Sequence, residues 1–221
     1  MVIAVCVFFL FLTGICLAWR IACRKREIPW PWWLAWVMEN PYMLLVNPAG
    51  RIVHSLSLQP GMSLLDLGCG AGRITVPAAV RLGPGGQALG VDMQERMISR
   101  LHRRARRYGV QNIRTQRLRL NQDLLPGPEG RTGWDRVSLV TVLGEIPDRF
   151  GLLQRVHNIL GPRGILVITE VIPDPCYLRP ATVRRQAAAA GFAVVRLERR
   201  WLSWTLHLRR IREPAPQSHD L

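Results

Sequence analysis

Short apolar runs alternate with amphipathic segments along most of the chain. Glycine, proline or charged residues bound each run, which is typical of buried strands. We expect strands at residues 62–67, 87–91, 136–143 and 164–170. Between them apolar residues recur at helical spacing. We expect helices at residues 73–82, 95–108, 149–160 and 183–190. This alternation predicts an α/β domain with a doubly wound, mostly parallel sheet and helices on both faces.

Three further segments complete the predicted domain. Residues 39–59 are typical of a helix and a connector, and residues 113–120 form a strand pattern that arginines interrupt. The last two strands, residues 192–197 and 202–208, are joined by a short link, and the second alternates apolar and polar residues. A short link joins antiparallel neighbours, so we expect an antiparallel hairpin at one edge of the sheet.

The N-terminus carries a long uncharged stretch. Residues 2–19 contain no charge, and Arg20, Arg24, Lys25 and Arg26 follow them. A spanning helix needs about 17–25 residues, and a secretory signal would carry positive charge before its apolar run. The sequence therefore predicts an uncleaved transmembrane anchor over residues 1–23. By the positive-inside rule the protein would be single-pass, with its N-terminus outside and its domain cytoplasmic.

A basic, tryptophan-rich segment follows, over residues 24–38. Its tryptophans are Trp30, Trp32, Trp33 and Trp36. Such a segment suits the headgroup zone of a membrane, or it packs on the domain as a lid. We place the α/β domain at residues 39–212 and a disordered tail at 213–221.

The net charge is +15, and Lys25 is the only lysine. This arginine excess reflects either genome composition or an anionic partner, such as a lipid surface. Residues 96–119 hold nine arginines, and no RNA-binding motif accompanies them, so a nucleic-acid partner is not expected. The five cysteines show no metal-ligand spacing, which predicts reduced thiols and no metal site.

The stretch LLDLGCGAGR, residues 64–73, is the main candidate for chemistry. Gly68, Gly70 and Gly72 follow a strand and open a helix, where bare backbone can approach a ligand closely. The third glycine comes one residue earlier than in the dinucleotide pattern GxGxxG. Asp92 ends the next strand and can accept the hydroxyls of a ribose, and Asp66 suits a ligand with a cationic amine. Ribose and amine without phosphate describe S-adenosyl-L-methionine (SAM). An NAD-type dehydrogenase is the competing enzyme class.

Four motifs in order resemble class I SAM-dependent methyltransferases, which have a Rossmann-like fold. They are LLDLGCGAGR, ALGVDMQERMI (88–98), VTVLGEIPD (140–148) and ILGPRGILVITE (159–170). ENPYMLLVNP and EVIPDP are also similar to the ubiquinone and menaquinone biosynthesis branch, and the resemblance covers residues 39–209. It implies cofactor contacts from Asp66, Gly68, Cys69 (through its backbone), Gly70, Gly72, Asp92 and Met93.

The resemblance is weaker after the third strand, where the family often has an acid that accepts from the adenine amino group. Arg119 or Asn121 occupies the corresponding place, and Asp123 comes somewhat late. Arginine cannot accept a hydrogen bond, whereas asparagine can. We therefore expect Asn121 to contact the adenine.

Glu145 follows the fourth strand and is the candidate general base. Alternatively it caps the next turn or holds Arg149. The sequence predicts a SAM-dependent methyltransferase for a small lipophilic or membrane-associated acceptor. A catalytically silent membrane-tethered scaffold and an RNA methyltransferase are the alternatives.

Overall fold

We analysed a computed structural model of the chain. The structure describes residue 14 and residues 17–22, 31–32, 40–172 and 174–211. The predicted tail and most of the predicted anchor lie outside these residues. The predicted domain boundaries at residues 39 and 212 stay predictions.

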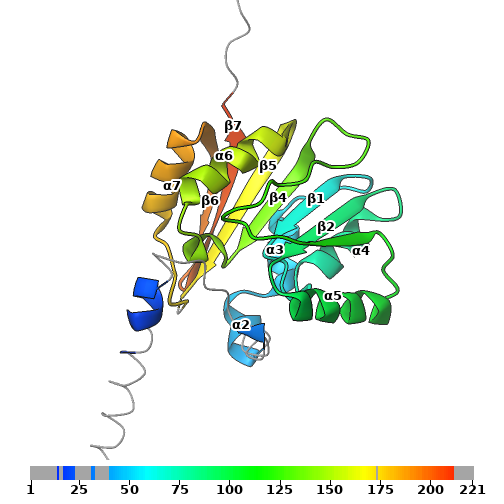
Figure 1. Cartoon of the computed structure of the whole chain (residues 1–221), viewed down its shortest axis with the longest axis horizontal. Coiled ribbons are helices and arrows are strands. Elements are labelled where there is room, and N and C mark those ends of the chain that lie inside the picture. Colours follow the sequence, from blue (N-terminus) through cyan, green and yellow to red (C-terminus); the bar gives the residue numbers. More distant parts are fainter. Residues whose placement is uncertain (1–13, 15–16, 23–30, 33–39, 173, 212–221) are drawn as a thin grey trace, which may run out of the picture.

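Seven strands in the described part of the chain form one sheet, in the order β3-β2-β1-β4-β5-β7-β6 (Figure 1). The strands are β1 (Ser63–Leu67), β2 (Gln87–Asp92), β3 (Ile113–Arg117), β4 (Trp134–Val140), β5 (Leu160–Val171), β6 (Phe192–Arg199) and β7 (Ser203–Arg210). Neighbours from β3 to β5 are parallel, and β7 is antiparallel to both β5 and β6. The predicted α/β sheet with an antiparallel hairpin at one edge is confirmed.

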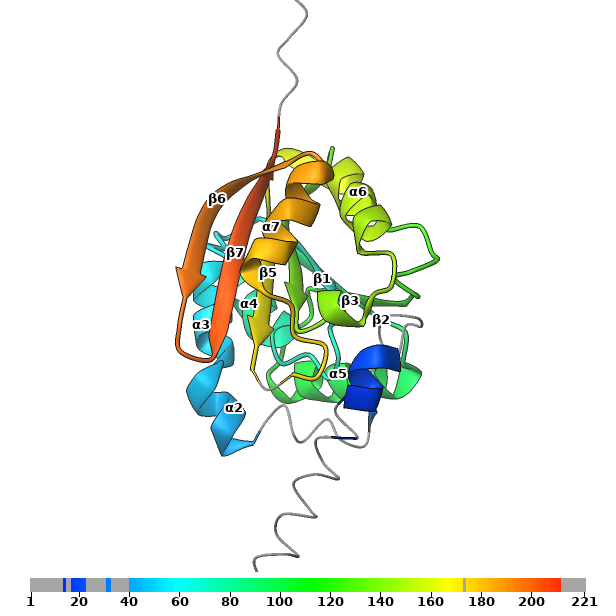
Figure 2. The same ribbon diagram turned by 90° about the vertical axis from the view of Figure 1, so that its left-hand side faces the viewer.

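Helices cover both faces of this sheet (Figures 1 and 2). They are α2 (Pro41–Val46), α3 (Ala49–Ser55), α4 (Thr75–Leu82), α5 (Glu95–Arg107), α6 (Arg149–Ile159) and α7 (Pro180–Ala189), with a 3₁₀ turn, η2 (Leu143–Glu145). One apolar core lies between the sheet and α6 and α7, and a second lies between the sheet and α3 and α4. Because both faces are covered, all five residues of β1 are buried.

The switch between strands β1 and β4 positions the candidate site. Helices α4 and α5 connect β1, β2 and β3 on one side of β1, whereas β4 lies on its other side. The strand order therefore reverses at β1, where the loop after the strand opens at the carboxyl edge of the sheet. Ligands of open α/β sheets bind at such a point.

The structure contradicts the predicted single-pass topology. No helix within the described ranges is long and apolar enough to cross a membrane. A membrane localisation with the N-terminus outside is therefore not supported.

Of the tryptophan-rich segment, the structure describes residues 31–32, and Trp32 packs on arginines of α5. The guanidinium groups of Arg96 and Arg100 lie 4.3 and 5.4 Å from the centre of its ring.

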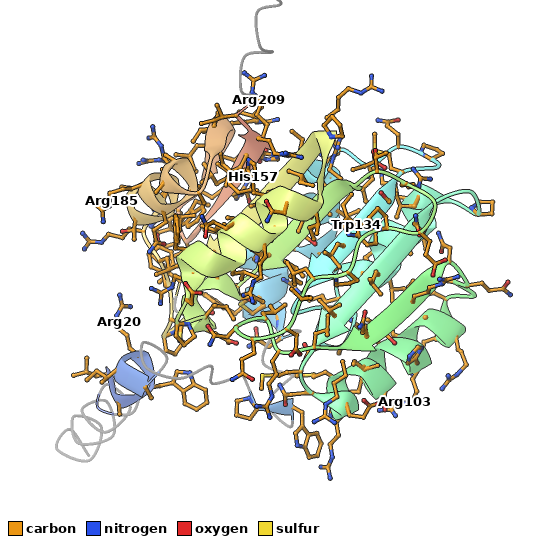
Figure 3. All side chains as sticks on the ribbon, turned by 45° about the horizontal axis from the view of Figure 1, so that its top comes forward. Arg20, Arg103, Trp134, His157, Arg185 and Arg209 are labelled. Atoms are coloured by element: carbon orange, nitrogen blue, oxygen red, sulfur yellow. The ribbon has the colours of Figure 1, made fainter. Side chains whose placement is uncertain are left out.

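The arginines of α5 lie away from its buried apolar face. Met97, Ile98, Leu101 and Ala105 are buried, whereas Arg103 projects outward (Figure 3). Tyr108, which follows this helix, is 66% exposed. Tyr108 is the residue that ends the helix, and so it no longer follows the helical spacing.

Candidate functional site

The glycine loop between β1 and α4 is fixed to the neighbouring strand. The backbone N–H groups of Gly68 and Cys69 both donate to the carbonyl of Val91, at 2.8 and 2.9 Å. Gly68, Gly70 and Gly72 have φ angles of +73°, +52° and +78°. Residues with a side chain rarely adopt these angles, so glycine is required for the path of the loop.

The three glycines face different surroundings. A Cβ at Gly68 would overlap the side chain of Val142, and one at Gly72 would come within 2.8 Å of the Leu101 side chain. A Cβ at Gly70 would meet no atom within 4 Å. Gly68 and Gly72 therefore serve close packing, and Gly70 is the glycine whose backbone borders open space.

Asp92 braces this loop from the end of β2. Its Oδ2 accepts a hydrogen bond from the Gly70 N–H at 2.9 Å, and its Oδ1 accepts from the Gln94 N–H at 2.8 Å. Burial raises the pKa of this carboxyl, and the N–H groups of Gln94 and Gly70 oppose that shift. Asp92 remains half-buried, and each oxygen keeps a lone pair for a ligand hydroxyl.

Asp66 is buried inside the protein, whereas its position in the sequence predicts contact with a ligand. Its side chain is 2% exposed. Thr75 Oγ1 donates to one carboxylate oxygen at 2.6 Å, and Ser138 Oγ donates to the other at 2.7 Å. Burial raises the pKa of Asp66, against the effect of these two hydroxyls and of Arg73. The carboxyl links β1, β4 and α4, and this placement supports a structural role better than the predicted contact with a ligand amine.

Cys69 lies in the loop with its thiol turned away from the open side. A Cβ at Gly90 of β2 would lie 3.0 Å from the Cys69 Sγ, so the thiol packs on that strand. Burial and the nearby carboxyls of Asp92 and Asp66 raise the pKa of the thiol well above its usual range. The side chain is therefore inert, and a contact with a ligand would come from the backbone, as predicted.

The segment after β3 approaches the same edge. Arg117 Nε donates to the carbonyl of Met93 at 3.1 Å. Asn121 Oδ1 accepts from the Asp148 N–H at 3.1 Å, and Asp123 Oδ2 accepts from the Arg119 N–H at 2.7 Å. Asp123 therefore closes its own turn. The half-buried Asn121 keeps its amide donors, and its oxygen is already engaged.

The turn after β4 touches the glycine loop. Thr141 has a φ of +56°, which is unusual for a β-branched residue and ends the strand earlier than the sequence predicted. Val142 packs on Gly68, and Gly144 lies so close to the next loop that a Cβ would overlap the Cys176 carbonyl. Glu145 is half-buried in this turn. The glycine loop and the loop after β5 are thus connected through residues 142–144.

Two carboxyls that were not selected from the sequence lie at the end of β5. Glu170 is 1% exposed, and its Oε1 has no hydrogen-bond partner among the described residues. Burial and the carboxyl of Asp174 raise the pKa of Glu170 well above its usual range. Burial raises the pKa of Asp174 to about 6. The motif EVIPDP contained both acids, but the resemblance alone assigned them no role.

Described residues near the N-terminus contact the loop after β5. Arg20 donates to the carbonyl of Pro175 at 3.2 Å, and Tyr42 donates to the carbonyl of Ile172 at 2.9 Å. Cys176 is disulfide-bonded, and Cys69 is free. The prediction of reduced thiols is therefore wrong at Cys176.

The model of a methyltransferase domain family matches residues 58–198, which is more than half of the chain. The chain belongs to the methyltransferase domain family. The matched residues include the glycine loop, Asp92 and the turn after β4. The predicted resemblance is confirmed at this level, and the predicted anchor is not supported.

Curated relatives of this chain are named for different molecules. Nocamycin O-methyltransferase of Saccharothrix syringae is 33% identical over 128 residues, 58% of this chain and 44% of the relative. A demethylmenaquinone methyltransferase of Geobacillus stearothermophilus is 28% identical over 119 residues, 54% of this chain and 49% of the relative. A 23S rRNA (uracil(1939)-C(5))-methyltransferase of Alcanivorax borkumensis is 33% identical over 132 residues, 60% of this chain and 26% of the relative. The matches therefore span less than half of each relative.

The fold also matches solved methyltransferases. A SAM-dependent methyltransferase from Aquifex aeolicus superposes with a TM-score of 0.72 and 19% identity, over 81% of this chain and 98% of that one. SAM is the expected cofactor of this methyltransferase domain. The residues present fit it, since Gly70 offers open backbone and Asp92 offers half-buried carboxylate oxygens. When bound, SAM supplies an activated methyl group.

Proposed function

We propose that the chain transfers a methyl group from SAM to a small, largely apolar acceptor. The observation that carries the cofactor part is the pairing of Asp92 with Gly70, because it holds a carboxylate beside the open backbone of the loop. In this proposal Gly68, Cys69, Gly70, Asp92, Met93 and Asn121 hold the cofactor, and Gly72 and Asp66 shape the loop. Glu145 remains a predicted general base.

The character of the acceptor is inferred from the side chains at the carboxyl edge of the sheet. Tyr42 and Trp201 are 40% and 92% exposed. Tyr42 bonds to the Ile172 carbonyl, and the Ile172 N–H bonds to the carbonyl of Leu202, next to Trp201. These links place apolar side chains in one band beside the loop after β5. An exposed apolar band favours an apolar ligand, and two relatives are named for small-molecule acceptors.

Calorimetric titration of the full chain with SAM tests the cofactor assignment, with NADH as competitor. We expect saturable SAM binding that NADH does not displace. Absence of binding at millimolar SAM would contradict the proposal. Methyl-labelled SAM then reports the acceptor class. A label that organic solvent extracts supports an apolar acceptor, whereas a label that ribonuclease destroys would indicate an RNA methyltransferase.

A further inference from the structure

Asp174 is linked to the glycine loop through three contacts. Val142 packs on Gly68, and Gly144 of the same turn packs on the carbonyl of Cys176. Cys176 in turn donates its N–H to Asp174. This series of contacts places Asp174 in the loop after β5, at the carboxyl edge of the sheet. The turn after β4 lies between it and the glycine loop.

The carboxyl of Asp174 is held in a fixed position and is partly accessible. Its Oδ1 accepts from the Cys176 N–H at 2.7 Å. Its Oδ2 accepts no hydrogen bond from any residue that the structure describes, and the residue is half-buried. One oxygen therefore orients the group, and the other is available to a ligand.

Charged groups on three elements act on Asp174 or on its neighbour Glu170. Glu170 of β5 interacts with Asp174 as a like charge, and Arg20 of the helical residues 17–22 is the cation that acts on Asp174. Arg149 of α6 acts on Glu170. Burial raises the pKa of Asp174 to about 6, so it is a carboxylate near neutral pH. The pKa of Glu170 is raised well above its usual range by burial and by the carboxyl of Asp174.

We propose that Asp174 is the general base that removes the proton from a hydroxyl acceptor, a phenol or an enol, during methyl transfer. This inference rests on the proposed function. The acceptor O–H bond breaks and its proton passes to Oδ2 of Asp174. The new bond joins the acceptor oxygen to the methyl carbon, and the carbon–sulfur bond breaks with its electron pair left on sulfur. The proton then leaves Asp174 for water.

The assignment places the base on the loop after β5, whereas the sequence pointed to Glu145 in the facing turn. A base works best when its pKa lies near the working pH, and a positioned base contributes about 10²–10⁴-fold to the rate. Asp174 meets this condition and has an oxygen to offer. The experiment therefore compares Asp174→Asn with Glu145→Gln directly.

The first measurement needs no acceptor. The protein is labelled with ¹³C at the aspartate side-chain carboxyls and titrated by NMR. We expect one resonance that is missing in Asp174→Asn and that titrates near pH 6. Titration of that resonance at the ordinary aspartate value, about 4, would overturn the inference. Calorimetry with SAM shows whether each variant keeps its cofactor site.

The second measurement uses methyl-labelled SAM and phenols of graded acidity, from 1-naphthol to nitrophenols, with thiophenol as an acceptor that ionises unaided. Wild-type transfer to 1-naphthol should fall as the pH drops through 6, because the base becomes protonated. Asp174→Asn should lose about 100-fold or more with 1-naphthol and lose this pH dependence. The loss of transfer rate in Asp174→Asn should become smaller as the acceptor becomes more acidic, and it should be absent with thiophenol.

Each outcome bears on one proposal. An equal loss with all acceptors, or a loss confined to Glu145→Gln, would overturn the role of Asp174. A wild type that binds SAM but methylates no phenol would overturn the acceptor class, while the proposed function stands. A wild type that does not bind SAM would overturn the proposed function, and this inference with it. Glu129→Gln, 68% exposed and paired with Arg114 at the opposite edge, is the control that should change nothing.

Discussion

Oδ2 of Asp92 accepts a hydrogen bond of 2.9 Å from the backbone N–H of Gly70. The two residues belong to different strand-to-helix connections, so this bond joins the loop after β1 to the end of β2. It fixes the one glycine of the loop that borders open space. The carboxylate that a ribose would meet and the backbone that the rest of the cofactor would meet are therefore held by a single contact.

Replacing Asp92 should weaken cofactor binding. Asp92→Asn keeps the size of the side chain but loses the charge and one of its two acceptors. Hydrogen bonds to charged groups contribute about 1.5–3 kcal/mol, so we expect SAM affinity to fall by roughly 10–100-fold. Calorimetry measures the affinity, and the melting temperature shows whether the fold is kept. Unchanged affinity in a folded variant would remove Asp92 from the cofactor site.

Gly70 and Gly61 form a matched pair for testing the open backbone. Both have a positive φ, and a Cβ at either would meet no atom within 4 Å. Alanine at each position should therefore cost a similar backbone strain, about 1 kcal/mol. Only Gly70→Ala should reduce SAM affinity, because only that Cβ would project into the space of the ligand. Equal affinity of the two variants would show that the ligand does not approach Gly70.

The sequence was sufficient for the sheet because its buried strands are short apolar runs with clear boundaries. The strand–loop–helix spacing also brings Gly70 and Asp92 to one edge of the sheet, where they form a hydrogen bond. Their contact with SAM stays a prediction. Spacing could not show that Asp66 is buried and accepts hydrogen bonds from the hydroxyls of Thr75 and Ser138. Those partners lie on α4 and β4, and they meet Asp66 only after the chain has folded.

The sequence also could not predict that Asp174 and Glu170 are buried together. Two acids four residues apart are a common pattern, and their surroundings depend on the turn after β4 and on described residues near the N-terminus. The anchor prediction failed differently. An uncharged stretch near the lower length limit satisfied the rule for a span, but no described helix meets the requirement.

Asp66 should make stability depend on pH. Its pKa is raised in the folded state, so the folded protein binds its proton more tightly than the unfolded chain does. The stabilisation from this proton is complete below the unfolded value of about 3.8. It is lost as the pH rises through the folded pKa. Asp66→Asn carries no such proton, so its unfolding free energy should lack this decline, as measured by urea unfolding across the acid range. A decline of the same size in both proteins would contradict the assignment.

Gly144 should be essential for the close contact between the turn after β4 and the loop after β5. A Cβ at this position would overlap the carbonyl of Cys176, and because that obstacle is backbone, one of the loops must move. We expect Gly144→Ala to destabilise the fold by about 1–3 kcal/mol. Gly50→Ala in α3 is the control, since its Cβ meets nothing within 4 Å, and alanine in a helix should stabilise by roughly 0.5–1 kcal/mol. Thermal unfolding measures both.

Methyl transfer should fall in Gly144→Ala while SAM affinity is kept. The loop that is displaced carries Asp174, whereas the glycine loop is a different segment. A variant that keeps both its stability and its transfer rate would show that this contact does not position the acceptor side.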